Sequence, residues 1–323
     1  MRNTDKPGAT NPPAGADPAG YVGSAQSRQR AQDNAGAGMQ YAAPGSQGAP
    51  AGAGAAAALG GGGGGPQITL AQAQLMALQI TTCFEGGKSM NYQALADNFD
   101  EQIMSFGLIQ WNFGQNTLGP LLKKMLARDA ARFAACFGPS TDYAVLKAAL
   151  DGDDEAGQKT WTLDLLQRDK PAWRAAFQAV GAVDEFNAIQ REQAAAEYHP
   201  LVMRAVDQLR HVAPALMRAL EFRSYAALFD LCVQQHSITK ALDEIQLRAK
   251  SEKPASQLDL LKIAVVERAK VAGSDWQSDC ISRRMGILTG VPYESTEHGV
   301  TKKRTNPQLA LALQFGAARV VGL

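Results

Sequence analysis

Two acidic residues, Glu85 and Asp100, lie where a folded chain can hold a pair of carboxyl groups across a cleft. Glu85 ends the apolar stretch Cys83-Phe84 and is followed by Gly86-Gly87, and Asp100 lies shortly before the apolar run that begins at Ser105. Such a pair can hydrolyse a glycosidic bond, because one group protonates the leaving oxygen while the other activates water. The alternative is that Glu85 only ends a helix and Asp100 only occupies a turn.

The surroundings of the two acids differ in the way that this chemistry requires. Glu85 follows apolar residues, so we expect desolvation to raise its pKa and favour the protonated acid. Asp100 lies near a polar loop, which we expect to leave it ionised. The spacing of fifteen positions is by itself weak evidence, so both interpretations stay open at this point.

The neighbouring pattern predicts the elements that would position these acids. Thr69 is a plausible N-cap, and apolar residues at helical spacing predict a helix that runs up to Glu85 and stops at Gly86-Gly87. The segment Asn91 to Asn98 is polar and turn-rich, and Phe106 to Trp111 is typical of a short strand or extended core segment. We therefore expect a small sheet or hairpin beside the helix, with Phe106 and Trp111 in the core.

The rest of the body is predicted to be helical, which gives a mainly α (α+β) fold class. A helix is expected from Asn116 until Gly138-Pro139 ends it. Further helices are expected near Tyr143 to Leu150, Thr160 to Leu166, Pro171 to Val180, Val183 to Glu197, Pro200 to Phe222, Ser224 to Gln234, Ile238 to Ala249 and Ala255 to Ala272.

The first 66 residues differ in composition from the remaining chain. They are mostly Gly, Ala, Pro, Ser, Gln and Asn and end in a glycine run from Gly60 to Gly65. Such a segment buries too little apolar surface to offset its chain entropy, so we predict a disordered leader over 1–66. The remainder, 67–323, is long enough for one large domain or two lobes around a cleft.

Charge and hydropathy exclude several kinds of partner. The net charge of +1 gives no electrostatic argument for nucleic acid, and the basic run Lys302-Lys303-Arg304 is expected to be a solvated loop. No apolar run is long enough to span a membrane, and no apolar segment typical of a secretory signal follows Met1. We expect a cytoplasmic location by default. The flexible leader equally suits export by a specialised secretion machinery, with a chaperone as a further partner.

The common cofactor and metal motifs are missing from the sequence. The four cysteines contain no C-x-x-C pair and are expected to be buried thiols in helices, and the four histidines have no zinc-binding spacing. The acidic run Asp151 to Glu155 has Thr162 where a calcium loop needs its twelfth-position glutamate, so we expect a surface turn. No G-x-S-x-G or Walker loop is present. We predict neither a cofactor nor a metal.

Three blocks of the sequence resemble the chitosanase-like glycoside hydrolases of the lysozyme superfamily. The first is the order F-E-x(14)-D-x(4)-S-F-G, formed by Glu85, Asp100, Ser105 and Gly107. The second comprises Gln193, Glu197-Tyr198-His199-Pro200 and the segment 227–234, and the third comprises Glu267 to Lys270 and Ser282 to Gly290. The resemblance implies a lysozyme-like, two-lobed helical domain over 67–323.

The resemblance also implies roles for particular residues. Glu85 would be the general acid, Asp100 the general base, and Ser105 a hydroxyl that helps to hold the attacking water. Asp230, Arg268 and Arg284 are similar to a charged network behind the site of that family, in which arginines keep carboxylates ionised and oriented. The reaction would proceed with inversion on a polymer of amino sugars, with peptidoglycan preferred over chitosan because of the leader.

One departure from the family pattern keeps an alternative open. Related sequences tend to continue after the base as D-G-x-G, whereas this chain has Asp100-Glu101-Gln102-Ile103. Side chains at both glycine positions make a positive φ costly. A non-catalytic secreted effector or wall-binding protein with the same fold, or a helical scaffold without a glycan site, is therefore the alternative to an enzyme.

Overall fold

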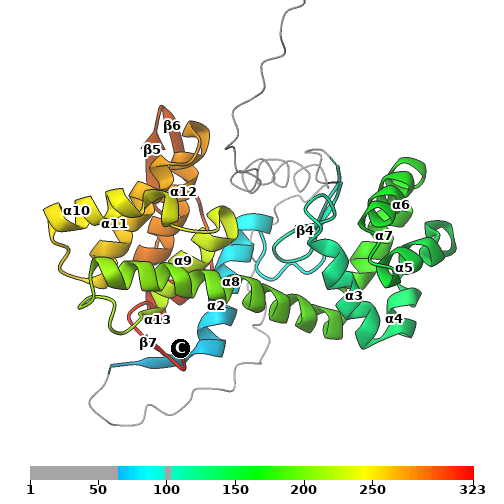
Figure 1. The fold of residues 1–323 in the computed structure, drawn as a ribbon, viewed down its shortest axis with the longest axis horizontal. Helices are drawn as coiled ribbons and strands as arrows, with labels where there is room; N and C mark the ends of the chain where they lie inside the picture. The colour runs from blue at the N-terminus through cyan, green and yellow to red at the C-terminus, as the bar shows by residue number, and fades with distance from the viewer. Residues whose placement is uncertain (1–64, 99–102) are drawn as a thin grey trace, which may run out of the picture.

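The structure is a computed structural model that describes residues 65–98 and 103–323 (Figure 1). Apart from Gly65 and Pro66, the predicted leader lies outside the described residues, and so does Asp100.

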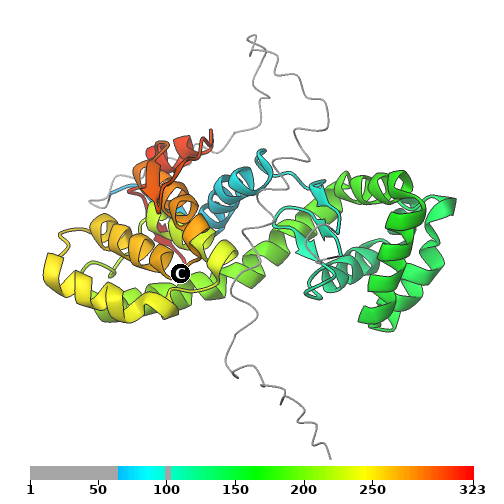
Figure 2. The same cartoon turned by 90° about the horizontal axis from the view of Figure 1, so that it is seen from above.

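The described chain is mainly helical, which confirms the predicted fold class. Figures 1 and 2 show two helical lobes joined by the long helix α8 (Asp184–Val212). The first lobe contains α2 (Leu70–Gly86), α9 (Phe222–Gln235), η3 (Thr239–Ala241), α10 (Leu242–Glu252), α11 (Gln257–Lys270), α12 (Ser274–Thr289) and α13 (Leu309–Phe315). The second lobe contains α3 (Leu118–Arg128), α4 (Ala130–Ala135), η2 (Pro139–Thr141), α5 (Tyr143–Asp151), α6 (Glu155–Arg168) and α7 (Lys170–Gly181).

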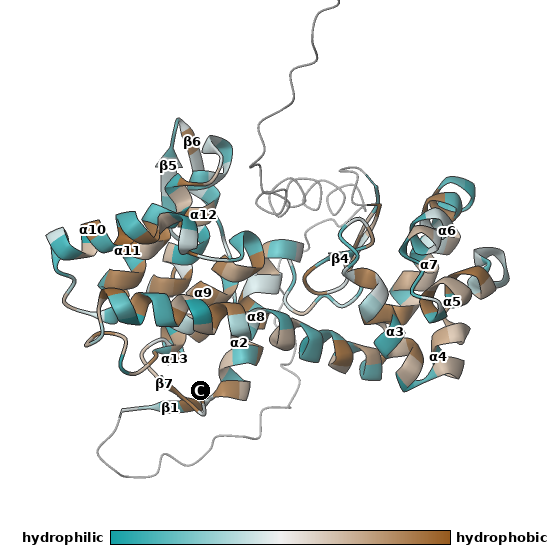
Figure 3. Cartoon of the chain, viewed as in Figure 1, coloured by the Kyte–Doolittle hydropathy of each residue, from teal (hydrophilic) through white to brown (hydrophobic). Residues whose placement is uncertain are grey.

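Buried apolar side chains fill both lobes and form one continuous cluster. Figure 3 shows the hydrophobic positions of the helices interleaved with hydrophilic ones, as expected where one face packs and the other meets water. In the first lobe, α9 lies at the centre and is buried from Ser224 to Cys232. In the second lobe, the rings of Phe133, Phe137, Trp161 and Phe177 are buried and pack edge-on or tilted against one another.

Helix α2 begins and ends where the sequence predicts. Thr69 is its N-cap and forms a capping box, since its side chain accepts from the Gln72 N–H at 3.2 Å and Gln72 Oε1 accepts from the Thr69 N–H at 2.9 Å. At the other end Gly87 is the C-cap, with a left-handed φ of 69°. These two caps place Glu85 in the last turn of the helix.

A small antiparallel sheet follows α2, as predicted, but its strands are shorter than expected. Strand β3 (Ser105–Phe106) pairs with β2 (Leu95–Ala96) on one side and β4 (Trp111–Asn112) on the other. The prediction of one extended segment from Phe106 to Trp111 is wrong. Gly107 and Gln110 have positive φ values of 81° and 59° and reverse the chain between the two strands.

The helix boundaries differ from the prediction in two places. The helix expected from Asn116 to Phe137 is divided at Asp129, which has an extended backbone and caps α4 through its side-chain Oδ1, which accepts from the Arg132 N–H. Conversely, α8 continues through Pro200, where two helices were expected. Pro200 and Ala196 are both exposed, so water can bind the Ala196 carbonyl that the proline leaves without a helical partner.

The C-terminal part of the first lobe contains elements that the sequence analysis does not predict. Helix α12 is buried on nearly every side, so it lacks the polar face that reveals a surface helix. It is followed by the hairpin β5 (Glu294–Glu297) and β6 (Val300–Lys303), and β7 (Arg319–Val321) pairs in parallel with β1 (Gln67–Thr69). The prediction of a solvated loop at 302–304 is wrong. Residues 302 and 303 end strand β6, and the Arg304 side chain is hydrogen-bonded to residues of α2 and α12.

The remaining local predictions concern cysteines, acids and membranes. All four cysteines are free, and Cys83, Cys232 and Cys280 are buried in helices, whereas Cys136 is half-buried. The acidic run at 151–155 forms the turn between α5 and α6, in which Asp154 caps α6. Within the described ranges no group of three metal-ligating side chains occurs, and no helix is both long and apolar enough to cross a bilayer.

Gly181 lies where α7 closely approaches the turn that leads into the sheet, and a substitution there tests whether this close approach stabilises the fold. A Cβ at this position would lie 2.5 Å from the Tyr92 carbonyl oxygen and 2.9 Å from the Gln93 Cα. We expect Gly181→Ala to lower the free energy of unfolding by about 1–3 kcal/mol, because backbone atoms must shift. Gly138→Ala, where an added Cβ meets nothing within 4 Å, should change it by less than about 0.5 kcal/mol. Urea denaturation compares the two, and equal losses would contradict the packing argument.

Candidate functional site

Glu85 is a buried acid in direct contact with a buried arginine. Only 8% of the residue is exposed, and its Oε1 lies 2.7 Å from Nη2 of Arg283 on α12. The predicted position at the end of an apolar helix is confirmed. Burial by itself disfavours the carboxylate, whereas the neighbouring arginine favours it.

Arg283 bridges two acids from different helices. The same Nη2 atom lies 2.6 Å from Oδ1 of Asp230 on α9, and neither Arg283 nor Asp230 is exposed. The guanidinium also lies over the Phe84 ring, 5.1 Å from its centroid. Burial by itself would lower the pKa of Arg283, but the charges of Asp230, Glu85 and Asp279 outweigh it and hold that pKa well above its ordinary value.

Arg284 joins the same network from the next position of α12. Its Nε atom lies 3.3 Å from Oδ2 of Asp230, and it donates to the side-chain oxygens of Gln234 at 2.6 Å and Gln235 at 3.1 Å. The structure thus brings Asp230 and Arg284 together behind Glu85, as the predicted charged network requires.

Arg268 lies beside this network but binds backbone rather than a carboxylate. It donates to the carbonyl oxygens of Ser237 at 2.6 Å and Gln235 at 3.1 Å, at the C-terminal end of α9. Burial lowers its pKa to about 10, and the neighbouring charge of Arg284 adds to the lowering. Its geometry is that of a residue that fixes the end of the helix carrying Asp230.

Arg283 is the residue of the site that the sequence reasoning missed. The third block includes both Arg283 and Arg284, and no amphipathic pattern in α12 shows which of them faces Glu85. One signal was available: Asp279 and Arg283 are four positions apart, which places them on the same face of a helix.

The two described residues that flank the Asp100 segment are linked to each other. The Ile103 N–H donates to Oδ1 of Asn98 at 2.8 Å. Ile103 has a φ of 70°, a left-handed conformation that is a genuine outlier for a β-branched residue. A positive φ is costly for a residue with a side chain, and the isoleucine adopts it at one of the two positions where the family that the sequence resembles tends to have glycine.

Ser105 lies in the middle strand of the small sheet. It is buried, and it pairs with Ala96 on one side and Asn112 on the other. Phe106 and Trp111 are also buried, which confirms that they belong to the core.

Helix α8 holds the sheet in place with residues of the second sequence block and one residue nearby. Trp111 Nε1 donates to Oε2 of Glu197 at 2.9 Å, and the Leu108 N–H donates to Oε1 of Gln190 at 3.0 Å. Tyr198 follows Glu197, and its pKa is raised well above the ordinary value by burial and by the charges of Glu197 and Glu85. This part of α8 therefore lies close enough to Glu85 for the two to interact electrostatically.

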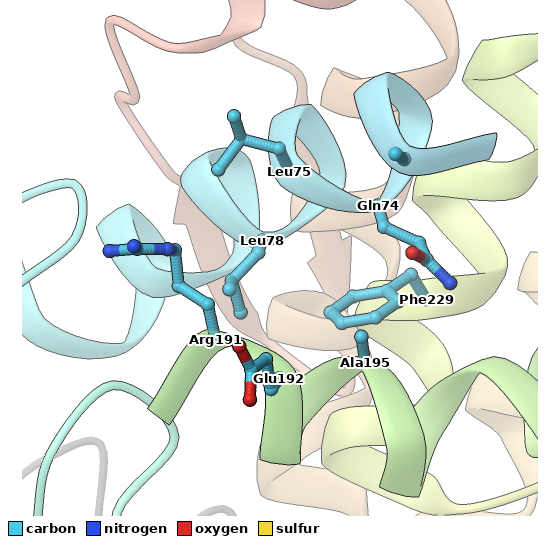
Figure 4. A pocket seen from close by; sticks show the side chains of 8 residues that line it. Gln74, Leu75, Leu78, Arg191, Glu192, Ala195 and Phe229 are labelled. Carbon is cyan, nitrogen blue, oxygen red and sulfur yellow. The ribbon is translucent and has the colours of Figure 1, made fainter. Parts of the chain in front are cut away.

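Two surface hollows lie along α8. One, of about 250 Å³, lies between α2, α8 and α9 and is lined mainly by apolar side chains with Arg191, Glu192 and Gln74 around them (Figure 4). The other, of about 690 Å³, lies between α3 and α8 and also includes Glu192. Glu85 lines neither of them, so both are separate from the buried acid.

Comparison with known proteins gives structural neighbours only. No family model matches the sequence, and no curated protein matches it significantly. The native chitosanase from Bacillus subtilis MY002 has a TM-score of 0.46 and 15% identity over 74% of this chain and 100% of that chain. The fold is similar to that of chitosanases.

Two further solved structures give the same result. A chitosanase complex has a TM-score of 0.44 and 15% identity over 71% of this chain and 95% of that chain. The E19A mutant of the Bacillus subtilis MY002 chitosanase, complexed with 6 GlcN, has a TM-score of 0.46 and 14% identity over 74% and 100% of the two chains.

Arg283→Met tests the buried network. The change leaves Glu85 and Asp230 buried without their shared counter-ion, so we expect the free energy of unfolding to fall by about 3–5 kcal/mol. Arg132→Met is the matched control, because Arg132 pairs with Glu185 where both side chains are half-exposed, and it should cost about 0–1 kcal/mol. If Arg283→Met does not fold, Arg283→Lys should fold with an intermediate loss. Equal losses for Arg283→Met and Arg132→Met would show that the buried ion pairs of Arg283 stabilise the fold no more than an exposed ion pair does.

Ile103 allows a test of backbone strain that does not depend on side-chain packing. Ile103→Gly and Ile103→Ala remove most of the same side chain, but only glycine adopts a positive φ freely, so we expect the glycine variant to be more stable by about 1 kcal/mol. Ile109, which is half-buried and has no positive φ, should show the opposite order. Thermal or urea unfolding of the four variants measures the difference, and the same order at both positions would refute strain at Ile103.

Proposed function

We propose that this protein is a glycoside hydrolase that acts on a polymer of amino sugars. The observation that carries the proposal is the buried Glu85, held in the last turn of α2 by the Arg283 bridge to Asp230. A surface turn or helix terminator has no need for a fully buried counter-ion. A reacting acid does, because its position and protonation must be set by its surroundings.

In the proposed reaction, Glu85 protonates the glycosidic oxygen as the bond to the leaving sugar breaks. Asp100, as the general base, removes a proton from a water that attacks the anomeric carbon from the opposite face, with Ser105 helping to hold that water. This inverting route requires the two carboxyl groups to be about 6.5–9.5 Å apart so that the water fits between them. Burial favours the protonated form of Glu85 and Arg283 opposes it, so the two together set the protonation of the acid, and Arg283 also fixes the direction of its carboxyl group.

Peptidoglycan is the preferred substrate and chitosan the second choice. The preference for an amino-sugar polymer follows the order of Glu85, Asp100, Ser105 and Gly107 in the sequence. The preference for peptidoglycan follows the Ala/Gly/Pro-rich leader, which suits a bacterial wall-degrading protein exported by a specialised secretion machinery.

A non-catalytic wall-binding protein or secreted effector is the second candidate. The observation in its favour is Ile103, which occupies a glycine position of the related sequences in a strained conformation. Such a protein would retain binding through the same fold and would lose turnover.

Glu85→Gln distinguishes the two candidates. If Glu85 is the general acid, the variant should release reducing ends at least about a hundredfold more slowly than the wild type, with its circular dichroism unchanged. Glu294→Gln, at an exposed position of β5, is the control and should match the wild type. Binding to the polymer that persists in Glu85→Gln, together with a wild type that releases no product, would favour the non-catalytic protein.

The same assay separates the two substrates. The purified full-length protein is incubated with chitosan and with purified cell walls, and the products are identified by mass spectrometry. Loss of turbidity in the walls, absent with Glu85→Gln, supports peptidoglycan. Cleavage of chitosan without any effect on cell walls would overturn that preference.

A further inference from the structure

Arg304 connects the helix that carries Glu85 to the helix that carries Arg283. It follows directly after β6, the strand that stands beside α12 in Figure 1. Its Nη1 lies 2.6 Å from Oδ1 of Asp279 on α12, and its Nη2 donates to the Phe84 carbonyl oxygen on α2 at 2.8 Å. The guanidinium therefore bridges the two helices next to the Glu85–Arg283 pair.

In its contact with Phe84, Arg304 donates a hydrogen bond to a backbone carbonyl for which α2 itself provides no donor. Carbonyls of the last helical turn lack helical donors, and here the Gly87 N–H binds the Cys83 carbonyl. Helix α2 has no basic residue in its last turn. Arg304 supplies both the donor and the positive charge that a helix C-terminus favours, one residue before Glu85.

A second side chain strengthens this attachment. Asn306 is buried, and its Nδ2 donates to the Ile80 carbonyl at 2.9 Å. Ile80 and Phe84 are four positions apart, so their carbonyls lie along one face of α2. The segment 304–306 thus follows the last turns of the helix and does not touch it at one point only.

The contact with Asp279 reaches the other side of the network. Asp279 lies one turn before Arg283 on α12, and its charge is one of those that raise the pKa of Arg283. Its second oxygen accepts from Gln234 of α9 at 3.3 Å, and Gln234 in turn accepts from Arg284. Arg304 is therefore coupled to all three helices that supply the buried charges.

We propose that Arg304 is a positioning residue for Glu85, which acts by fixing the last turn of α2 against α12 through Phe84 and Asp279. The inference rests on the proposed hydrolase function. It assigns a role in the reaction to a residue of the C-terminal segment that does not touch the reacting atoms. The competing interpretation is that Arg304 only anchors the β5–β6 hairpin and contributes to stability.

Arg304→Met is compared with Lys303→Met, the adjacent exposed residue of β6. Displacing the acid reduces stabilisation of the transition state more than it reduces the affinity for substrate. We therefore expect kcat to fall at least about tenfold in Arg304→Met, with KM within about threefold of the wild type. Lys303→Met should leave both constants unchanged. Arg304→Lys should restore only part of kcat, because an ammonium lacks the planar fork that holds a carboxylate and a carbonyl together.

A second measurement does not depend on turnover. The carboxyl carbon of Glu85 is followed by NMR in protein labelled with ¹³C-glutamate, and its signal is assigned by its loss in Glu85→Gln. The other charged and titratable groups of this region are the same in all variants, namely Arg283, Arg284, Asp230, Asp279, Glu197, Tyr198 and Cys83. Removing the Arg304 cation should move the Glu85 titration midpoint upward in Arg304→Met and not in Lys303→Met.

The outcomes separate the two proposals. If Arg304→Met lowers only the melting temperature and leaves kcat, KM and the Glu85 midpoint at the Lys303→Met values, Arg304 is structural and the inference is wrong. If the wild type hydrolyses neither polymer, the proposed function fails. The NMR comparison then still decides whether Arg304 controls Glu85.

Discussion

The arrangement of the first lobe depends on one guanidinium that has no access to water. Arg283 is fully buried, and removing such a charge from water costs several kcal/mol, which only closely placed partners can offset. Asp230 and Glu85 supply two carboxylates and Phe84 supplies an aromatic face, while Nε and Nη1 have no hydrogen-bond partner within the described residues. Helices α2, α9 and α12 must therefore meet at one point, because a shift of any of them would leave a buried charge unpaired.

Arginines from distant parts of the chain hold the ends of the two helices that carry these acids. Arg304 binds the Phe84 carbonyl at the end of α2, and Arg268 binds the Gln235 and Ser237 carbonyls at the end of α9. Helix C-termini combine unsatisfied carbonyls with the negative end of the macrodipole, so an arginine there satisfies both requirements. The carboxylates of Glu85 and Asp230 are thereby fixed through the backbone as well as through their ion pairs.

The bounds of α2 can be predicted from residues within or next to the helix, whereas the rest of the site depends on contacts between residues that are far apart in the sequence. Thr69 and Gly86-Gly87 act within their own helix, so the position of Glu85 can be read from neighbouring residues. Arg283 and Arg304 act across 198 and 220 positions of the chain, so the sequence around each arginine does not identify the residue that it binds. Two helix boundaries were predicted wrongly because one local signal outweighed another. At Asp129 a capping side chain interrupts the hydrophobic period, and at Pro200 an exposed position allows the helix to continue through the proline.

Ile103 shows how the other side of the proposed site is constrained. An isoleucine keeps a φ of 70° only if the contacts of the surrounding residues stabilise this backbone by more free energy than the strain costs. Asn98 binds its N–H, and the next residue, Met104, is fully buried with its sulfur 3.3 Å from Trp173 Nε1. Ile103 itself is half-buried and packs against the apolar core, so its side chain also helps to hold this conformation. The strain at residue 103 is therefore sustained by tertiary contacts on both sides of it, and it fixes the backbone at the point where the chain enters the small sheet.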